Sequence, residues 1–413
     1  KQHAKFNPVT RGFDRYYGMI GGCENHFNPG FDAAPGQPIP AYKIASNRWS
    51  IDEKDIPENS NYIPQDSMFY DTDAFTNRAL TWLDDYKKDD KPFFLYMAYT
   101  APHWPLHAWP ADIAKYKGVY DGGYEVIRQA RYKRQVEIGL VDPKISPLPP
   151  MEIGETKPKW ESLSAEERKL EATRMEVYSA MVDRLDQNIG RLLKRLEEQG
   201  KLKNTLVFFL SDNGACAVDP KVDKEVIKAP MGSVASYPSY GQNWATVSNT
   251  PLKKWKTTSY EGGISTPLIV NWPAVVKPLT GWNNEATHLV DIMPTILSVA
   301  GANFPGESKE PKILPTDGVS LLPALKGEQL SRKNPLFYQF GKGAAIRDGQ
   351  WKLVRLGATW ELYDLASDRT ETNNLINKHP DIAKKMEVQW LAWWKDCTGE
   401  AWTGKAPKEP KDD

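Results

Sequence analysis

The chain has 413 residues, with 53 Lys and Arg against 53 Asp and Glu, so its formal net charge is zero. A neutral chain has no overall field that attracts polyanions, which argues against nucleic acid or an anionic membrane surface as its main partner. No apolar run approaches the roughly 18 residues that span a bilayer, so no membrane span is expected. The three cysteines are far apart and form no CxxC pair, which indicates neither a disulfide framework nor a thiolate zinc site.

The first seventy residues are rich in Gly, Pro, Asn and aromatic residues, which predicts surface loops around one short element. Apolar residues at helical spacing between Asp71 and Tyr86 predict a helix that Asp71-Thr72-Asp73 can cap. Lys91-Pro92 breaks this helix. The apolar run 93–99 that follows is typical of a strand buried on both faces of a parallel sheet.

The middle of the chain repeats this order of helix and strand. The charged segment 124–139 predicts an exposed helix, and the Pro-rich segment 141–150 predicts an irregular connector. Ser164 and Glu167 have the spacing of a capping box, and the helical period continues from there to Gly200. A second buried strand is expected within 205–214. Two helix–strand pairs indicate an α/β fold with a mostly parallel central sheet flanked by helices.

The last part of the chain has a different pattern. A third strand is expected within 264–273 and a further helix within 287–301. Residues 351–356 and 360–365 read as an antiparallel hairpin, and a terminal helix carries Ile382, Met386, Trp390 and Trp393 on one face. We therefore expect a main domain over 1–316 and a smaller C-terminal α+β subdomain with an antiparallel sheet over 317–413.

Polar residues follow the second predicted strand directly. Asp212 and Asn213 offer a carboxylate and an amide oxygen, which are hard donors suited to Ca²⁺ or Mg²⁺ but too few for a complete shell. The alternative is that Asp212-Asn213-Gly214 is only a turn, because these residues tolerate left-handed backbone.

Two cationic candidates fall at the same expected edge of the sheet. His103 follows the 93–99 run and can bind an anionic oxygen or protonate a leaving group, or it can be a loop histidine with a backbone partner. Lys256, in a cluster with Lys253 and Lys254, can hold an oxyanion by its charge, although loop lysines usually have no such role. Metal-ligand oxygens, a histidine and a lysine at the same edge of one sheet together favour a functional site.

Six blocks in order resemble the type I, formylglycine-dependent sulfatases, specifically the bacterial arylsulfatase branch. The resemblance covers essentially the whole chain. The blocks are NPVTRGFDRYYG (7–18), PFFLYMAYTAPHWPL (92–106), NTLVFFLSDNG (204–214), NTPLKKWKTTSYEGGISTPLIVNWP (249–273), HLVDIMPTIL (288–297) and ELYDLASDRTETNNL (361–375).

The resemblance implies an alkaline-phosphatase-like α/β domain and the hydrolysis of sulfate esters with a Ca²⁺ and a formylglycine nucleophile. It further implies that Asp212 and Asn213 are two metal ligands, that His103 contacts the sulfate, and that Lys256 binds sulfate beside the leaving-group oxygen. Metal and cations would stabilise charge on the transferring sulfuryl group while a proton donor assists the alcohol.

The sequence also departs from the family pattern. It contains no Cys or Ser followed by x-P/A-x-R, no early Asp pair and no GKWHLG-type block, and Gln339 and Phe340 replace a frequent acid–His pair. Because the chain begins with Lys1 rather than Met, we expect that the N-terminal portion with the nucleophile and the remaining metal ligands is missing, and that this chain alone has negligible turnover.

Two alternatives to a sulfatase remain. One is a phosphomonoester or phosphonate hydrolase of the same superfamily. The other is a non-catalytic glycan-binding homologue, suggested by Trp104, Trp109 and Trp244 near the expected site, although packing under long loops also explains these residues. The expected partner is a sulfate-ester small molecule or a sulfated glycan. Family habit implies a periplasmic or secreted location.

Overall fold

The computed structural model divides the chain into two compact units. Unit 1 comprises Lys1–Tyr124, Ile153–Leu202 and Val218–Trp244, and unit 2 comprises Glu125–Glu152, Lys203–Ala217 and Ala245–Asp413. The expected division near residue 317 stays a prediction. The structure describes residues 7–19, 25–28, 49–52, 54–56, 69–153, 159–220, 229–276, 281–304 and 316–403.

Unit 1 combines a small antiparallel sheet with helices. The sheet has the strand order β1-β2-β3, and two of the boundaries with unit 2 fall within α3 (Gly123–Glu137) and α6 (Gly241–Ser248). The exposed helix expected over 124–139 is thus confirmed as α3. The other elements of unit 1 are β1 (Tyr17–Met19), β2 (Trp49–Ile51), β3 (Lys54–Ile56), α1 (Asp71–Asp85), α2 (Pro110–Ala114) and α4 (Ala165–Glu198).

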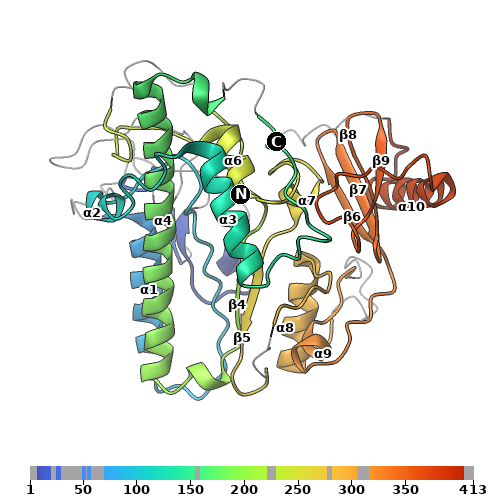
Figure 1. Ribbon diagram of the computed structural model, residues 1–413. Coiled ribbons are helices and arrows are strands. Elements are labelled where there is room, and N and C mark those ends of the chain that lie inside the picture. Colours follow the sequence, from blue (N-terminus) through green and yellow to red (C-terminus); the bar gives the residue numbers. More distant parts are fainter. Residues whose placement is uncertain are drawn as a thin grey trace. The chain divides into compact units, whose positions relative to one another are not determined.

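The long helix α4 begins with the predicted capping box. The Ser164 hydroxyl accepts a hydrogen bond from Glu167 N at 3.2 Å, and the Glu167 carboxylate accepts one from Ser164 N at 2.8 Å. Helices α1 and α4 lie side by side (Figure 1), and their shared core consists of Ala79, Leu83, Leu192 and Leu196.

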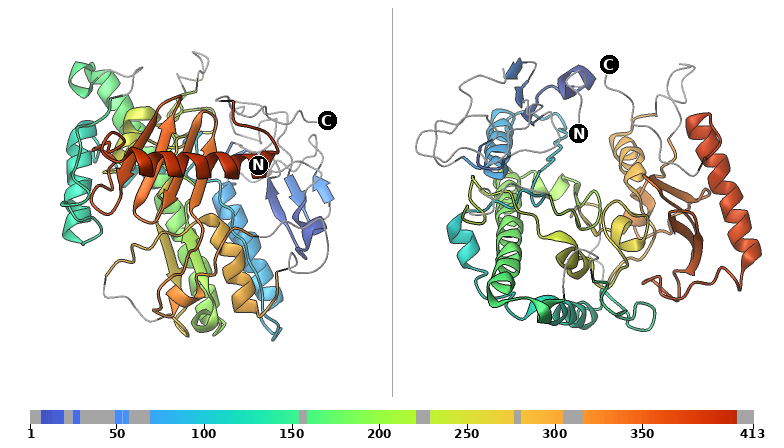
Figure 2. Two further views of the ribbon diagram at one scale, coloured as in Figure 1. Left: turned by 90° about the vertical axis from the view of Figure 1, so that its right-hand side faces the viewer. Right: turned by 90° about the horizontal axis from the view of Figure 1, so that it is seen from above.

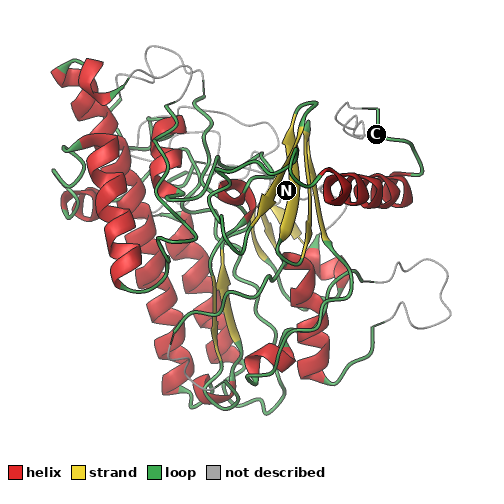
Figure 3. Cartoon of the chain, turned by 45° about the vertical axis from the view of Figure 1, so that its right-hand side comes forward, coloured by secondary structure: helices red, strands yellow, loops and turns green. Residues whose placement is uncertain are grey.

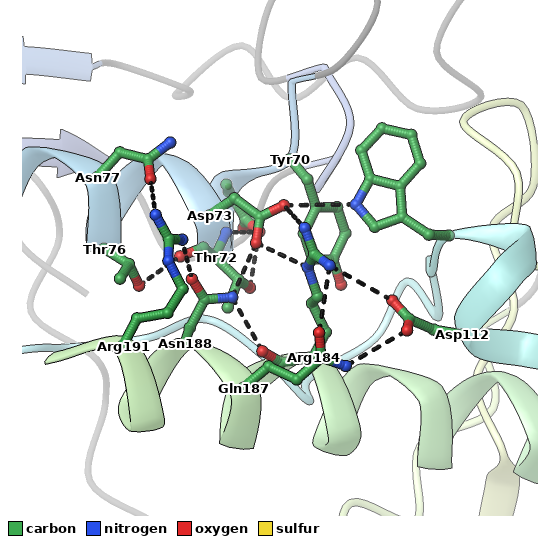
Figure 4. A network of polar contacts seen from close by, with 12 residues as sticks. Tyr70, Thr72, Asp73, Thr76, Asn77, Asp112, Arg184, Gln187, Asn188 and Arg191 are labelled. Atoms are coloured by element: carbon green, nitrogen blue, oxygen red, sulfur yellow. Dashed lines mark hydrogen bonds and ion pairs between the residues drawn. The ribbon is translucent and has the colours of Figure 1, made fainter. Parts of the chain in front are cut away.

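A polar network joins the first turn of α1 to the middle of α4 (Figure 4). Arg184 donates from Nε and Nη2 to the two oxygens of Asp73, at 2.8 and 2.7 Å. Asn188 Nδ2 donates to Asp73 Oδ1 at 2.8 Å. A paired guanidinium and carboxylate fix both distance and orientation, so this network sets the register of the two helices.

The segment 93–99 is not a strand, which corrects the prediction. It has no hydrogen-bonded neighbouring strand among the described residues, and Phe94 and Tyr96 are 59% and 70% exposed. Leu95, Met97 and Tyr99 pack against the α1–α4 core. The run is therefore extended with one packed face, because apolar composition alone does not show whether a partner strand is present.

Unit 2 contains the other two predicted strands, β4 (Val207–Leu210) and β5 (Leu268–Asn271), seen as a yellow pair in Figure 3. They pair antiparallel, with Phe208 opposite Val270. The parallel pairing expected for this sheet is thus wrong for these two strands, because a buried apolar run carries no information on strand direction. The helix expected within 287–301 is confirmed as α8 (Ile292–Ala300).

A four-stranded antiparallel sheet with a terminal helix completes unit 2. The strands β6 (Leu336–Phe340), β7 (Gly343–Asp348), β8 (Trp351–Leu356) and β9 (Trp360–Asp364) follow one another in space as in sequence. Helix α10 (Pro380–Thr398) lies across one face of this sheet (Figure 2). The predicted hairpin and terminal helix are confirmed. Their shared core includes Ile346, Leu353, Leu362, Met386 and Trp390.

Two short helices of unit 2, α7 (Glu261–Ile264) and α9 (Leu322–Leu325), connect these parts. The Pro-rich segment 141–150 has neither helix nor strand, as predicted. No helix in the described ranges is long and apolar enough to cross a membrane.

Candidate active site

Three of the four predicted site residues lie in one unit. Asp212 and Asn213 directly follow β4, and Lys256 lies in the loop that leads to α7, all within unit 2. His103 lies in unit 1.

Backbone hydrogen bonds tie the two loops of unit 2 together. Gly214 N donates to Gly263 O at 3.0 Å, and Lys256 N donates to Ala215 O at 3.0 Å. A Cβ at position 214 would lie 1.8 Å from Gly262 O, so only glycine permits this approach. Gly214 and Gly262 therefore allow the Asp212–Asn213 turn to pack against the Lys256 loop.

Asn249 reinforces this junction, and the sequence analysis did not single it out. Its Oδ1 accepts from Ala215 N at 3.0 Å, and its Nδ2 donates to Lys254 O at 2.9 Å. One side chain thus satisfies backbone groups of both loops. Its position at the start of the block 249–273 was the only sequence signal.

The Asp212–Asn213 turn has donors of the right kind for a hard cation. Asp212 is exposed, and Asn213 Nδ2 donates to Gly214 O at 2.9 Å, so its Oδ1 is the atom suited to a cation. Calcium needs six to eight oxygen ligands. No group of three or more His, Cys, Asp or Glu residues in the described part of the chain is arranged to hold a metal. The residues fit calcium in chemistry but do not form a site by themselves.

The other two lysines of the cluster have structural contacts. Lys253 Nζ donates to Tyr363 Oη at 3.1 Å and lies 4.6 Å from the centre of the Tyr260 ring. Lys254 Nζ lies 2.8 Å from Glu152 Oε2. The backbone of Lys256 is held next to the Asp212–Asn213 turn, where its N–H donates to Ala215 O.

Glu261, which follows the Lys256 loop, belongs to a network of buried charged side chains. Lys352 Nζ lies 2.7 Å from Glu261 Oε1 and 2.8 Å from Glu371 Oε1. Burial opposes ionisation of Glu261, but Lys352 and Arg369 outweigh it and lower its pKa to about 2. Burial raises the pKa of Glu371 to about 7 despite the same lysine. Sequence reasoning missed this network because Glu261 lies 91 residues from Lys352 and 110 residues from Glu371.

His103 is held in a defined orientation. Its Nδ1 lies 2.7 Å from the carbonyl oxygen of Trp104, and a carbonyl only accepts, so Nδ1 carries a hydrogen. A neutral His103 therefore has an acceptor at Nε2, and only the imidazolium form can donate a proton from that atom.

A second histidine supports the His103 loop. His26 Nδ1 lies 2.7 Å from Asp71 Oδ2, and its Nε2 lies 3.1 Å from the carbonyl oxygen of His103. Both partners accept, so His26 is the imidazolium. Burial alone would lower the pKa of His26, but the charge of Asp71 and the hydrogen bonds to Asp71 and to the backbone of His103 together outweigh it and raise that pKa. Asp71 is thus the partner of His26 rather than the predicted helix cap, since α1 begins with Tyr70 at its cap position.

Other candidates have packing roles. His107 is fully buried, with Nε2 2.8 Å from Ser236 O, and burial lowers its pKa to about 3. Trp244 is fully buried and donates from Nε1 to Glu171 O at 3.0 Å. Packing therefore explains Trp244, and its face is not open to a sugar ring.

Solved structures resemble the chain in fold. A structure titled Ps i-CgsB in complex with k-i-k-neocarrahexaose aligns with a TM-score of 0.65 and 23% identity, over 98% of this chain and 71% of that one. A structure in complex with its substrate D-glucosamine-2-N,6-O-disulfate aligns with a TM-score of 0.52 and 20% identity, over 93% of this chain and 76% of that one. The chain thus has the alkaline-phosphatase-like fold of these neighbours.

Sequence relatives identify the family. An uncharacterized sulfatase of Schizosaccharomyces pombe is 32% identical over 94% of this chain and 71% of its own length. An arylsulfatase of Klebsiella aerogenes is 33% identical over 80% of this chain and 69% of its own length. The sulfatase family model matches residues 4–302, and one described as N-sulphoglucosamine sulphohydrolase, C-terminal, matches 254–393. This chain therefore belongs to the sulfatase family of sulfuric ester hydrolases.

Proposed function

We propose that this sulfatase acts on a sulfate-ester small molecule or a sulfated glycan by a Ca²⁺-assisted formylglycine mechanism. The observation that carries the proposal is the glycine junction in unit 2, where Gly214 packs on Gly262 and Gly263 and Lys256 N donates to Ala215 O. It joins a pair of hard oxygen donors to a lysine-bearing loop. From the family resemblance, we also propose a periplasmic or secreted location.

Each residue has a role in this proposal. Asp212 and Asn213 would supply two of the metal's oxygen ligands, and the bound cation would neutralise charge on the sulfuryl oxygens. Lys256 would hold the sulfate as a point charge close to the leaving-group oxygen. His103 would contact the sulfate, and as the imidazolium it would donate a proton from Nε2 to the departing alcohol. The sequence contains no motif for the formylglycine, so no residue is assigned to it.

Metal binding can be tested without turnover. Calorimetric titration of the full-length protein with Ca²⁺ should show binding that Asp212→Asn weakens about tenfold or more, since one charged ligand is lost. Asp381→Asn, at an exposed position in the first turn of α10, is the matched control and should leave binding unchanged. Equal binding by wild type and Asp212→Asn would remove Asp212 from the metal site.

The reaction is tested with the full-length protein. Lys256→Ala should lower kcat/KM for an aryl sulfate by about 10²-fold or more, and Lys256→Arg should recover part of the loss because it keeps the charge. Lys385→Ala, on the exposed side of α10, is the control. A rate on aryl phosphate above that on aryl sulfate would favour the phosphomonoester or phosphonate alternative.

A further inference from the structure

One part of the C-terminal core gathers buried N–H donors without acceptors. Arg355 on β8 is 7% exposed, and its Nε and Nη2 have no hydrogen-bond partner among the described residues. The buried indole Nε1 groups of Trp394 and Trp402 likewise have no acceptor within those ranges. Because buried polar groups are nearly always hydrogen-bonded, four such donors in one cluster require a physical explanation.

The donors belong to a single cluster, which we call the Arg355 cage: Arg355, Trp360, Trp390, Trp394 and Trp402. The Arg355 Cζ lies 4.6, 5.5 and 5.0 Å from the ring centres of Trp360, Trp390 and Trp402. Trp402 contacts Trp390 and Trp394 with ring centres 5.2 and 4.7 Å apart. The cage thus has one guanidinium among indole rings.

Cation–π contact alone does not account for the cage. Three aromatic faces stabilise a desolvated guanidinium charge. They do not supply acceptors for its in-plane N–H groups, and they leave the indole N–H groups of Trp394 and Trp402 unsatisfied. A ligand with several acceptor atoms would satisfy both kinds of donor.

The carboxylate of Glu387, whose charge acts on Arg355, already accepts hydrogen bonds from two other side chains. Burial lowers the pKa of Arg355, and the negative charge of Glu387 offsets only part of this effect. Glu387 Oε1 accepts from Trp360 Nε1 at 3.2 Å, and Glu387 Oε2 accepts from Lys384 Nζ at 3.2 Å. The cage therefore offers donors that the neighbouring acid does not satisfy.

We propose that the Arg355 cage binds an oxyanion, either free sulfate or the sulfate group of a glycan. A sulfate oxygen accepts hydrogen bonds and carries negative charge, which suits a guanidinium and two indole N–H groups. Trp360 and Trp402 are partly exposed, whereas the four donor atoms are buried. The cage is built from β8, β9, α10 and the segment after α10, and not from the loops that carry Asp212 and Lys256. It is therefore a second anion site, independent of catalysis.

The test follows the indole N–H resonances of the ¹⁵N-labelled chain during titration with sodium sulfate, with sodium chloride at equal ionic strength as the reference. The Trp394 and Trp402 resonances should move and saturate with sulfate only. Arg355→Met should weaken sulfate binding about tenfold or more, because it removes the charge and keeps the aliphatic length. Lys385→Met, at an exposed position on α10, removes the same charge and should change nothing.

A second variant covers the case in which Arg355→Met does not fold. Trp402→Phe keeps an aromatic ring but removes one donor, and it should weaken sulfate binding severalfold. Absence of a sulfate-specific shift in the wild-type chain, or equal affinity in wild type and both variants, would overturn the proposal.

Two further titrations identify the source of the oxyanion. If a sulfated disaccharide binds more tightly than sulfate and its desulfated form does not bind, the ligand is a glycan sulfate. If sulfate binds as well as the sulfated disaccharide, the ligand is the free anion. Binding of the desulfated sugar with equal affinity would contradict an oxyanion site.

Discussion

Lys352 and Glu261 form an ion pair with 2.7 Å between Nζ and Oε1, and both side chains are almost completely buried. Glu261 is the first residue of α7 and precedes Gly262 and Gly263, which pack against Gly214. Lys352 lies on β8 of the C-terminal sheet. The ion pair therefore anchors the loop that carries Lys256 to the C-terminal sheet.

Lys352→Met should lower the free energy of unfolding by about 3–5 kcal/mol, because it leaves the buried charge of Glu261 without its fully buried partner and with Arg369 at 3.3 Å as its remaining ion pair. Urea denaturation followed by circular dichroism measures this change. Lys378→Met, at an exposed position, is the control and should have an effect within about 0.5 kcal/mol. A similarly small effect at Lys352 would show that the pair does not stabilise the fold.

The His26–Asp71 pair predicts a dependence of stability on pH. The pKa of His26 is raised, so the folded state holds its proton more strongly than the unfolded state. This contribution is complete below about pH 6.5, the ordinary histidine value, and is lost as pH rises through the raised pKa. The free energy of unfolding of the wild type should therefore fall above pH 6.5.

His26→Gln is the comparison for this pH effect, since glutamine cannot ionise. Its unfolding free energy should be lower than that of the wild type at pH 6 and should change less between pH 6 and 9. His107, whose pKa is lowered to about 3, affects stability only below about pH 6.5, so the change between pH 6.5 and 9 reports on His26. Parallel pH profiles for wild type and His26→Gln would rule out this contribution.

The sequence predicts best those elements whose signal is local. The capping box of Ser164 and Glu167 and the hairpin of β8 and β9 depend on residues close together in the chain, and both are confirmed. The strand predicted at 93–99 and a parallel pairing of β4 with β5 depend on distant partners, and both are wrong. Local periodicity reports which faces are apolar, but it does not report which strands meet or in which direction.

In the candidate site, too, the local motifs could be predicted from the sequence but the contacts between distant residues could not. The motif around Asp212 and the glycines at 262 and 263 are visible in the sequence, but their contact is not. The support of His103 by His26 joins residues 77 apart, and the pairing of Glu261 with Lys352 joins residues 91 apart. Such contacts cannot be derived from one sequence, because they depend on tertiary packing.

The glycine junction predicts a severe effect for a single methyl group. In Gly214→Ala the Cβ would lie 1.8 Å from Gly262 O, so the two loops must separate. We expect Ca²⁺ affinity to fall about tenfold or more, together with a loss of stability of about 1–3 kcal/mol from overpacking. Calorimetry and urea denaturation measure the two effects. Gly200→Ala is less suited as a control because its φ is +69°, whereas Gly190→Ala meets no atom within 4 Å.

The Arg184–Asp73 contact predicts that two cations of equal charge are not interchangeable. Arg184 reaches both oxygens of Asp73 at 2.8 and 2.7 Å, which the single ammonium of lysine cannot do with the same geometry. Arg184→Lys should therefore lower the free energy of unfolding by about 1–2 kcal/mol.

A double-mutant cycle with Asp73→Asn separates this contact from other effects of Arg184. Because Asn188 and Trp109 also donate to Asp73, the single variant Asp73→Asn should be the more destabilising of the two. The double variant should be more stable than the sum of the single losses predicts, by about 1 kcal/mol, since each single variant already disrupts the same two-oxygen contact. Strict additivity would mean that α1 and α4 are held together by their apolar core of Ala79, Leu83, Leu192 and Leu196 and not by this contact.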